Sequence, residues 1–138
     1  MEVRKELTDE WQRRGVEGQQ FATLTDIITQ AWADRTTKSY KQFKGLKKEN
    51  LRDNMTNLEL VLNMLAEATT TEISKERKPR TTAANRAVAA QGGRIAGNTR
   101  REIEAQTGKR IVSPLTAKQA LAEKTAEGIE HPEADTTE

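Results

Sequence analysis

All five aromatic side chains of this chain lie within its first 43 residues, and none follows Phe43: Trp11, Phe21, Trp32, Tyr40 and Phe43. Aromatic rings are the largest anchors of a small core, so we expect the core to belong mostly to residues 3–72. Leu, Ile, Val and Phe supply only 24 of the 138 positions. This share excludes a large enzyme fold with a deep interior and favours a small, loosely cored protein.

The spacing of apolar residues predicts two helices in the first 35 residues. Residues 3–14 have a helical pattern that Gly15 ends. The next helix carries one apolar face, formed by Leu24, Ile27, Ile28, Ala31 and Trp32. Thr23 and Asp26, three residues apart, indicate a capping box at the start of this second helix.

Two further helices are predicted before residue 73. A short one covers residues 36–44, with Gly45 behind it. Thr56 and Glu59 form a standard capping box for the next helix, which we expect to weaken at the β-branched run 69–71. Its apolar stripe is expected at the centre of the core and consists of Leu58, Val61, Leu62 and Leu65.

The second half of the chain has little to bury. Residues 83–91 are rich in alanine, and Gly92-Gly93 are expected to break the helical pattern. Thr99 and Glu102 indicate a further capping box, for a helix that Gly108 ends. A last helix is expected before residue 126. These residues offer too little apolar surface for an independent core, so we expect them to need a partner.

No alternating apolar run is long enough for a sheet, so the fold class is all-α. We expect a small multi-helix bundle with a polar hinge, an Ala/Gly-rich helical second half and a disordered acidic tail. The expected boundaries are 1–73 for a helical core domain with a basic face, 74–82 for the hinge, 83–126 for the helical extension and 127–138 for the tail.

Charge is distributed unevenly along the chain. Residues 35–52 contain seven basic residues and one acid, whereas residues 127–138 contain five acids and no Lys or Arg, so the net charge of +2 is a cancellation. The helix that carries Leu24 to Trp32 and the short, lysine-rich helix over residues 36–44 are joined by a tight turn. This arrangement suggests a helix-turn-helix. Lysines bind phosphates by releasing counterions. The expected nucleic-acid or polyanion contacts are Lys38, Lys41, Lys44, Lys47, Lys48 and Arg52.

Other interpretations of the charged segments remain open. The basic segment also fits a solvated face of a small bundle, and the turn between its two helices has no glycine of the kind expected for sequence-specific binding. Residues 92–101 form a glycine-rich stretch whose secondary anion-contact candidates are Arg94, Arg100 and Arg101. The alternative is that these glycines serve helix breaks or close helix packing. The acidic tail is either a solvated end or a segment that screens the basic residues of the same chain.

Several chemistries are excluded by residue types that the chain lacks. It has no cysteine and a single histidine, His131, so it offers no disulfide, no thiol nucleophile and no histidine-based triad beside a metal site. We therefore expect no catalytic residues, no cofactor and no metal. The longest apolar run is far too short to span a bilayer, and the N-terminus does not read as a signal peptide. We expect no membrane contact and a cytoplasmic location.

A set of sequence phrases occurs together in this chain: LTDEW (7–11), RGV (14–16), KGLKKENLRD (44–53), TNLEL (56–60), ATTTE (68–72) and GRIAGNTR (93–100). Together they resemble the C-terminal portion of DNA-damage-inducible protein D and of the prophage antirepressor-like proteins that carry a BRO-type N-terminal domain. The resemblance covers roughly residues 5–120, and residues 44–72 are its most specific part.

In that family the BRO-type domain is usually regarded as the DNA-binding half, and these 138 residues contain no counterpart of it. The resemblance implies a non-enzymatic protein of the bacterial DNA-damage (SOS) response or of prophage control. We therefore expect a non-catalytic regulatory or accessory module that binds a protein, a nucleoprotein filament or DNA, including non-specific nucleic acid. The alternative is a structural interaction protein that oligomerises, or folds onto a partner chain, through its Ala-rich helices.

Overall fold

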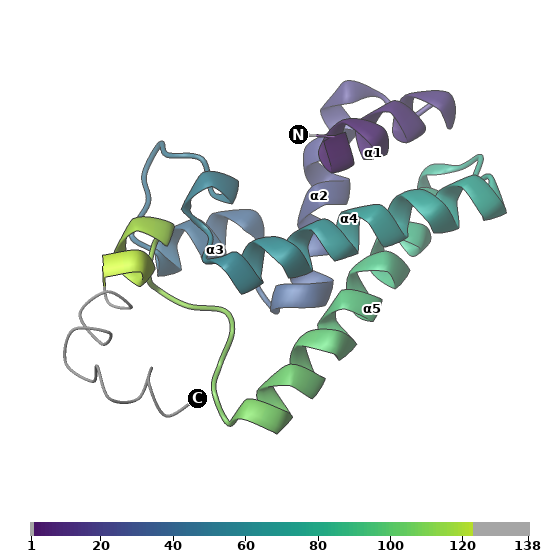
Figure 1. The fold of residues 1–138 in the computed structure, drawn as a ribbon. Helices are drawn as coiled ribbons and strands as arrows, with labels where there is room; N and C mark the ends of the chain where they lie inside the picture. The colour runs from purple at the N-terminus through teal and green to yellow at the C-terminus, as the bar shows by residue number, and fades with distance from the viewer. Residues whose placement is uncertain (1, 123–138) are drawn as a thin grey trace.

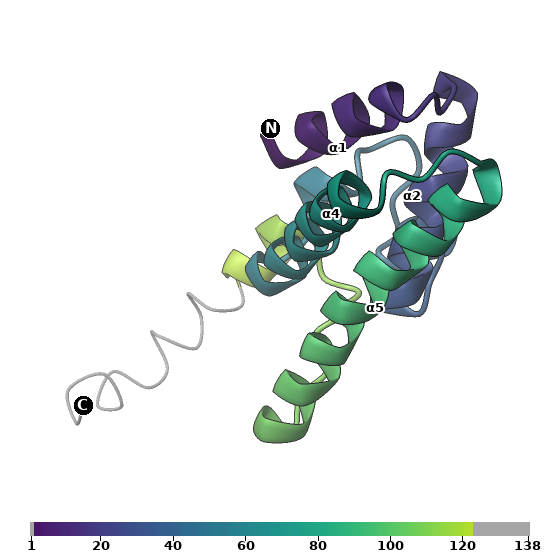
Figure 2. The same cartoon turned by 90° about the vertical axis from the view of Figure 1, so that its right-hand side faces the viewer.

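The computed structural model describes residues 2–122, and no strand occurs among them. The elements in chain order are α1 (Glu2–Arg13), α2 (Gly18–Ala33), α3 (Thr37–Phe43), the short 3-10 helix η1 (Arg52–Asn54), α4 (Asn57–Arg77) and α5 (Thr82–Thr107). Residues 117–122 are also helical. The connection between α4 and α5 lies at one end of both helices, from which they spread apart (Figures 1 and 2). The prediction of a small all-α bundle is confirmed.

The first two helices bury the aromatic anchors of the N-terminal third. Trp11 of α1 is fully buried, and its ring packs against Phe21 of α2 with 5.3 Å between the ring centroids. Trp32 of α2 is also fully buried, and its indole N–H donates to Asn63 of α4 at 3.2 Å. Gly15 takes the left-handed conformation, with φ of 80°, behind α1 as predicted.

The predicted start of α2 is wrong. The helix begins at Gly18 after Glu17, so Thr23 and Asp26 lie inside it rather than at its cap. Spacing alone does not distinguish a capping box from two polar residues on one helical face. The carboxylate of Asp26 accepts instead from the backbone N–H of Thr37 at 3.1 Å, and this bond joins α2 to the start of α3.

α4 begins as predicted, but its buried face differs from the predicted one. The capping box is present, with the backbone N–H of Thr56 donating to Glu59 at 2.9 Å. Leu58 and Val61 of the predicted stripe are 39% and 57% exposed. The helix does not weaken at residues 69–71 but continues to Arg77. Its buried face is largely polar and consists of Glu59, Leu62, Asn63, Ala66, Glu67, Thr70, Thr71 and Ser74.

α5 is one continuous helix of 26 residues, so the predicted break at Gly92-Gly93 and the predicted capping box at Thr99 and Glu102 are wrong. A Cβ on Gly92 would lie 2.8 Å from the backbone of Thr70, and one on Gly93 would lie 2.6 Å from a carbonyl oxygen of α2. The glycines therefore let α5 approach α2 and α4 closely, which was the alternative to an anion-binding loop. The small buried residues of α5 are Ala89, Gly92, Gly93, Ala96 and Gly97.

The connection between the two halves is shorter than the predicted hinge over residues 74–82. α4 includes residues 74–77, and only residues 78–81 separate it from α5. Lys78 takes a left-handed φ of 51° there, and Pro79 is buried. Pro79 therefore packs against the protein, whereas Lys78, Arg80 and Thr81 around it are exposed.

The second half contributes to the core instead of extending from it. α5 packs along both α2 and α4, and Ala89, Ala96 and Ile111 belong to the same buried cluster as Trp32. As expected, most of this cluster lies within residues 3–72, and Ala89, Ala96 and Ile111 of the second half complete it. Gly108 ends α5 as predicted, with φ of 71°. The predicted tail 127–138, with His131, and the end of the predicted extension 83–126 lie outside the described residues.

Candidate polyanion-binding site

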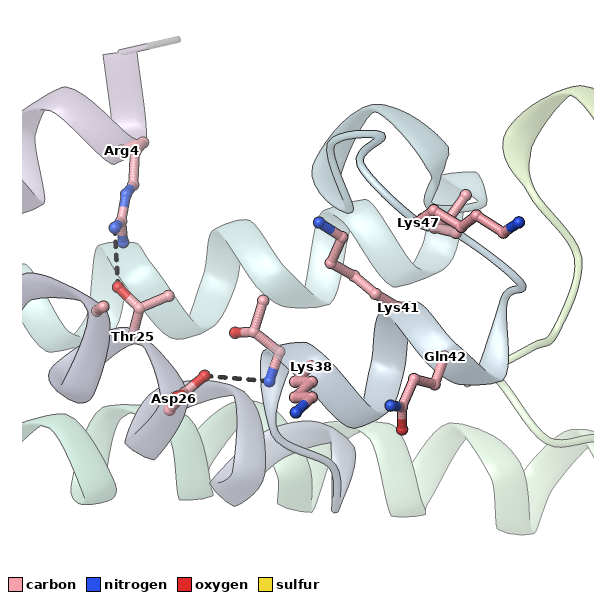
Figure 3. A pocket seen from close by; sticks show the side chains of 10 residues that line it. Arg4, Thr25, Asp26, Lys38, Lys41, Gln42 and Lys47 are labelled. Atoms are coloured by element: carbon pink, nitrogen blue, oxygen red, sulfur yellow. Dashed lines mark hydrogen bonds between the residues drawn. The ribbon is translucent and has the colours of Figure 1, made fainter.

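A basic hollow opens between α1, α2, α3 and the segment 46–55. It has two lobes of about 630 and 430 Å³, which share Arg4, Thr25, Thr37 and Lys41 in their walls. Both volumes fall in the range of ligand sites. Arg4 reaches in from α1 and Lys41 from α3, on opposite sides of the first lobe (Figure 3). The basic side chains of the hollow are Arg4, Lys38, Lys41, Lys47, Lys48 and Arg52.

The charge of the hollow is positive, since two carboxylates, Asp26 and Glu67, face these six basic groups among the described residues that line it. Glu49, outside that lining, also interacts electrostatically with Lys41. Asp26 is engaged by the backbone of Thr37. Glu67 lies between two guanidinium groups, at 3.3 Å from Arg4 and 2.8 Å from Arg52. With six basic groups and two carboxylates among the described lining residues, the hollow keeps a positive excess.

Four of the six predicted contacts lie around the hollow with their amino groups unpaired. Lys38, Lys47 and Lys48 are exposed and Lys41 is half-buried, and none makes an ion pair with a carboxylate of the described residues. Glu49, close to them in sequence, accepts instead from the backbone N–H groups of Lys47 and Lys48 at 2.8 and 3.0 Å. Those bonds lower the pKa of Glu49.

Lys44 is not a surface contact, and this part of the prediction is wrong. Its side chain is fully buried, with Nζ 2.7 Å from the carboxylate of Glu59. The same amino group donates to the carbonyl oxygen of Ser113 at 2.8 Å and to that of Leu115. Lys44 stands one helical turn after Tyr40, whose side chain is also fully buried, so both face inward.

Glu59 is the centre of this buried network. Besides Lys44, it accepts from the Tyr40 hydroxyl and from the backbone N–H of Ser113, the latter at 3.1 Å. Burial, together with the charge of Glu59, raises the pKa of Tyr40, so the hydroxyl stays a donor. The network fastens the segment 113–115 against α3 and α4, where a buried ion pair with satisfied hydrogen bonds is tolerated.

The two arginines of the hollow are recessed. The side chain of Arg52 is 19% exposed and that of Arg4 is 31% exposed, and both are held by Glu67. Arg4 also donates to the hydroxyl of Thr25 at 2.8 Å. Arg52 was predicted as a contact, whereas Arg4 was not. The sequence does carry a signal for Arg4, because this residue lies three positions before Leu7 and so shares the buried face of α1.

The three secondary candidates on α5 do not form an anion site. Arg100 is buried and bonded within the fold: it donates to the carbonyl oxygen of Trp32 at 2.7 Å and pairs with Asp34 and Glu104, each at 2.8 Å. Arg94 and Arg101 are exposed on the helix. The loop that would have grouped these arginines does not exist, because α5 continues through it.

Metal-binding clusters of three or more His, Cys, Asp or Glu side chains are absent from the part of the chain that the structure describes. Within the same residues, every helix is too short or too polar to cross a membrane. Comparison of the chain with protein-family models, curated proteins and solved structures gives no match.

Proposed function

We propose that this chain is a non-catalytic binding module for nucleic acid and that the basic hollow is its contact surface. The observation that carries the proposal is the set of four lysines around one hollow that lack ion pairs with the described carboxylates: Lys38, Lys41, Lys47 and Lys48. Such ammonium groups gain affinity for phosphates through counterion release. The hydroxyl of Thr37 in the same wall suits phosphate oxygens as well.

The biological setting of the proposal rests on the sequence resemblance described above. It points to a regulatory or accessory module of the bacterial DNA-damage response or of prophage control. Such a module acts by occupying DNA or a nucleoprotein filament, and a binding surface without catalytic groups is sufficient for that role.

The alternative, self-association through the Ala-rich helices, has less support. Ala89 and Ala96 are fully buried against other helices of the same chain. The small-residue face of α5 is already covered by α2 and α4, so it is not free to pair with a second chain.

Charge reversal at three lysines tests the proposed function. The triple variant Lys41→Glu, Lys47→Glu and Lys48→Glu should lose most of its affinity for DNA, because repulsion replaces three phosphate contacts. The slope of log affinity against log salt concentration should become shallower by at least about 2, because each lost phosphate contact removes roughly 0.7–0.9 from it. Fluorescence anisotropy between about 50 and 200 mM salt measures both quantities.

A matched control separates the hollow from overall charge. The variant Arg94→Glu, Arg101→Glu and Lys109→Glu changes the net charge equally, at exposed positions outside the hollow. It should bind nearly as the unaltered protein does. Equal losses in both triple variants, with unchanged circular dichroism, contradict a binding site in the hollow.

A further inference from the structure

We infer that the basic hollow takes the phosphates of a single, unpaired nucleic-acid strand rather than those of a duplex. This inference rests on the proposed function and names the ligand class of the same site. Four observations carry it: the depth of the arginines, the directions of the lysines, the packing of α3 and the side chains that line the hollow.

The arginines are recessed in the wall of the hollow. Arg52 and Arg4 are mostly covered, at 19% and 31% side-chain exposure, and they lie beside Glu67 in the wall of the second lobe. A duplex is stiff over about 50 nm and holds its phosphates on the outside of a rod. A single strand can turn individual phosphates inward toward recessed guanidinium groups.

The lysines call for a ligand with several phosphates. The side chains of Lys38, Lys41 and Lys47 point in different directions around the first lobe (Figure 3). Lys48 lines only the second lobe, whereas Lys41 lines both. One compact anion cannot contact amino groups that diverge in this way. A strand that passes Lys41 from one lobe to the other places successive phosphates near each of them.

α3 is not placed as a recognition helix for a duplex. A helix that reads the major groove must protrude into a channel about 12 Å wide and 8.5 Å deep. α3 has only seven residues, and Tyr40 is fully buried beneath it. Phe43 is covered by Arg35, whose guanidinium lies 3.8 Å from the ring centroid. The helix forms a wall of the hollow, so the predicted helix-turn-helix has no protruding second helix.

The lining of the hollow favours contact with the backbone of the strand over its bases. None of the described residues that line either lobe is aromatic, so the hollow offers no platform on which a base could stack. It offers amino and guanidinium groups and the hydroxyl of Thr37, whereas the hydroxyls of Thr25 and Thr29 already donate to carbonyl oxygens of α2. These groups bind phosphates and sugars without reading sequence, and so the binding should be independent of sequence.

The test compares three probes at the same salt concentration: a 20-nucleotide oligo-dT strand, a 20-base-pair duplex and inorganic tripolyphosphate. The inference predicts that the single strand binds at least tenfold more tightly than the duplex, and that tripolyphosphate competes only weakly. Duplex binding that equals or exceeds strand binding overturns the inference but leaves the proposed function intact. Efficient displacement of the strand by equimolar tripolyphosphate also overturns it, because the site is then one for a compact anion.

Single substitutions in the two lobes complete the test. Lys38→Gln affects only the first lobe, Lys48→Gln only the second, and Lys41→Gln the shared wall. Each should weaken strand binding about fivefold at 0.1 M salt and reduce the salt slope by about 0.7, the value for one phosphate contact. Arg94→Gln is the control outside the hollow. If neither strand nor duplex binds the unaltered protein, the proposed function fails together with the inference.

Discussion

Lys41 and Lys44 are three residues apart, yet one faces the hollow and the other is buried in the core. An ammonium group is buried only where a carboxylate and further acceptors replace its water. Glu59 and two backbone carbonyl groups supply those acceptors for Lys44. The charge of residues 35–52 is thus divided between the proposed contact surface and the core, and counting lysines along the sequence overstates the size of that surface.

Removal of the Lys44 amino group should destabilise the protein strongly. Lys44→Met leaves the buried carboxylate of Glu59 without its cation, and loss of one partner of such a pair costs about 3–5 kcal/mol. Urea unfolding measures this loss. Lys47→Met, at an exposed position of the hollow, is the matched control and should change the free energy of unfolding by less than about 0.5 kcal/mol. Equal stabilities of the two variants contradict a structural role for Lys44.

Residue roles in this site follow from tertiary partners that lie far away in the sequence. Lys38, Lys47 and Lys48 are exposed, as the sequence predicts for lysines on a short helix and on the loop that follows it. The burial of Lys44 depends on Glu59 and on the segment 113–115, up to 71 residues away, so local spacing gave no sign of it. Arg4 joins the hollow because α1 packs beside α2 and α4, which sequence patterns do not reveal.

At the scale of elements, α4 and α5 show why the apolar periodicity of the sequence predicted the helices and their buried faces only in part. The starts of α3 and α4 were located correctly, since Thr36 accepts from Ser39 and Thr56 exchanges bonds with Glu59. The burial of α4 was misassigned because its inward face holds carboxylates and threonines that are satisfied by other elements. α5 was divided wrongly because glycines usually end helices, whereas here they permit close packing.

A methyl group at the α2–α5 contact should destabilise the bundle. Gly93→Ala places a Cβ 2.6 Å from a carbonyl oxygen of α2, so the helices must separate, at a cost of about 1–3 kcal/mol. Gly18→Ala is the control, since a Cβ there meets nothing within 4 Å and helix propensity favours alanine by up to about 1 kcal/mol. Thermal unfolding should show a lower Tm for Gly93→Ala only. A Tm for Gly93→Ala at or above that of the unaltered protein contradicts the close contact.

At the scale of the whole molecule, buried or half-buried carboxylates fasten distant segments to one another. Glu10 of α1 accepts from Ser74 of α4 at 2.7 Å and from Arg14 at 2.8 Å. Burial acts to raise the pKa of Glu10, but its bonds from Ser74, Arg13 and Arg14 lower it overall. Glu104 is similar, since the backbone N–H of Ile111 and the side chain of Arg100 lower its pKa against the effect of burial.

These shifts make the fold sensitive to acid. The folded-state pKa values of Glu10 and Glu104 lie below their ordinary value of 4.5, so the unfolded chain takes up protons first as the pH falls. Their contribution to stability is present above that value and is lost below it. Tm should therefore fall steeply between about pH 5 and pH 3.

Glu10→Gln isolates one part of this pH dependence. The variant should be less stable at neutral pH, because its amide makes weaker bonds to Arg14, and it should show a shallower fall of Tm between pH 5 and pH 3. Glu102→Gln, at an exposed position of α5, is the control. A slope in Glu10→Gln as steep as that of the unaltered protein contradicts the linkage to Glu10.

The measurement that tests the binding site most directly is an NMR titration of the ¹⁵N-labelled protein with a 20-nucleotide single strand. In the proposed complex the strand lies against α3 and the segment 46–55, which line the hollow. The largest shift changes should therefore occur at the backbone amides of residues 37–48 and of Thr25 and Arg52, and the amides of residues 94–101 should remain unchanged. Changes concentrated in α5, with those of the hollow unaffected, would contradict the account.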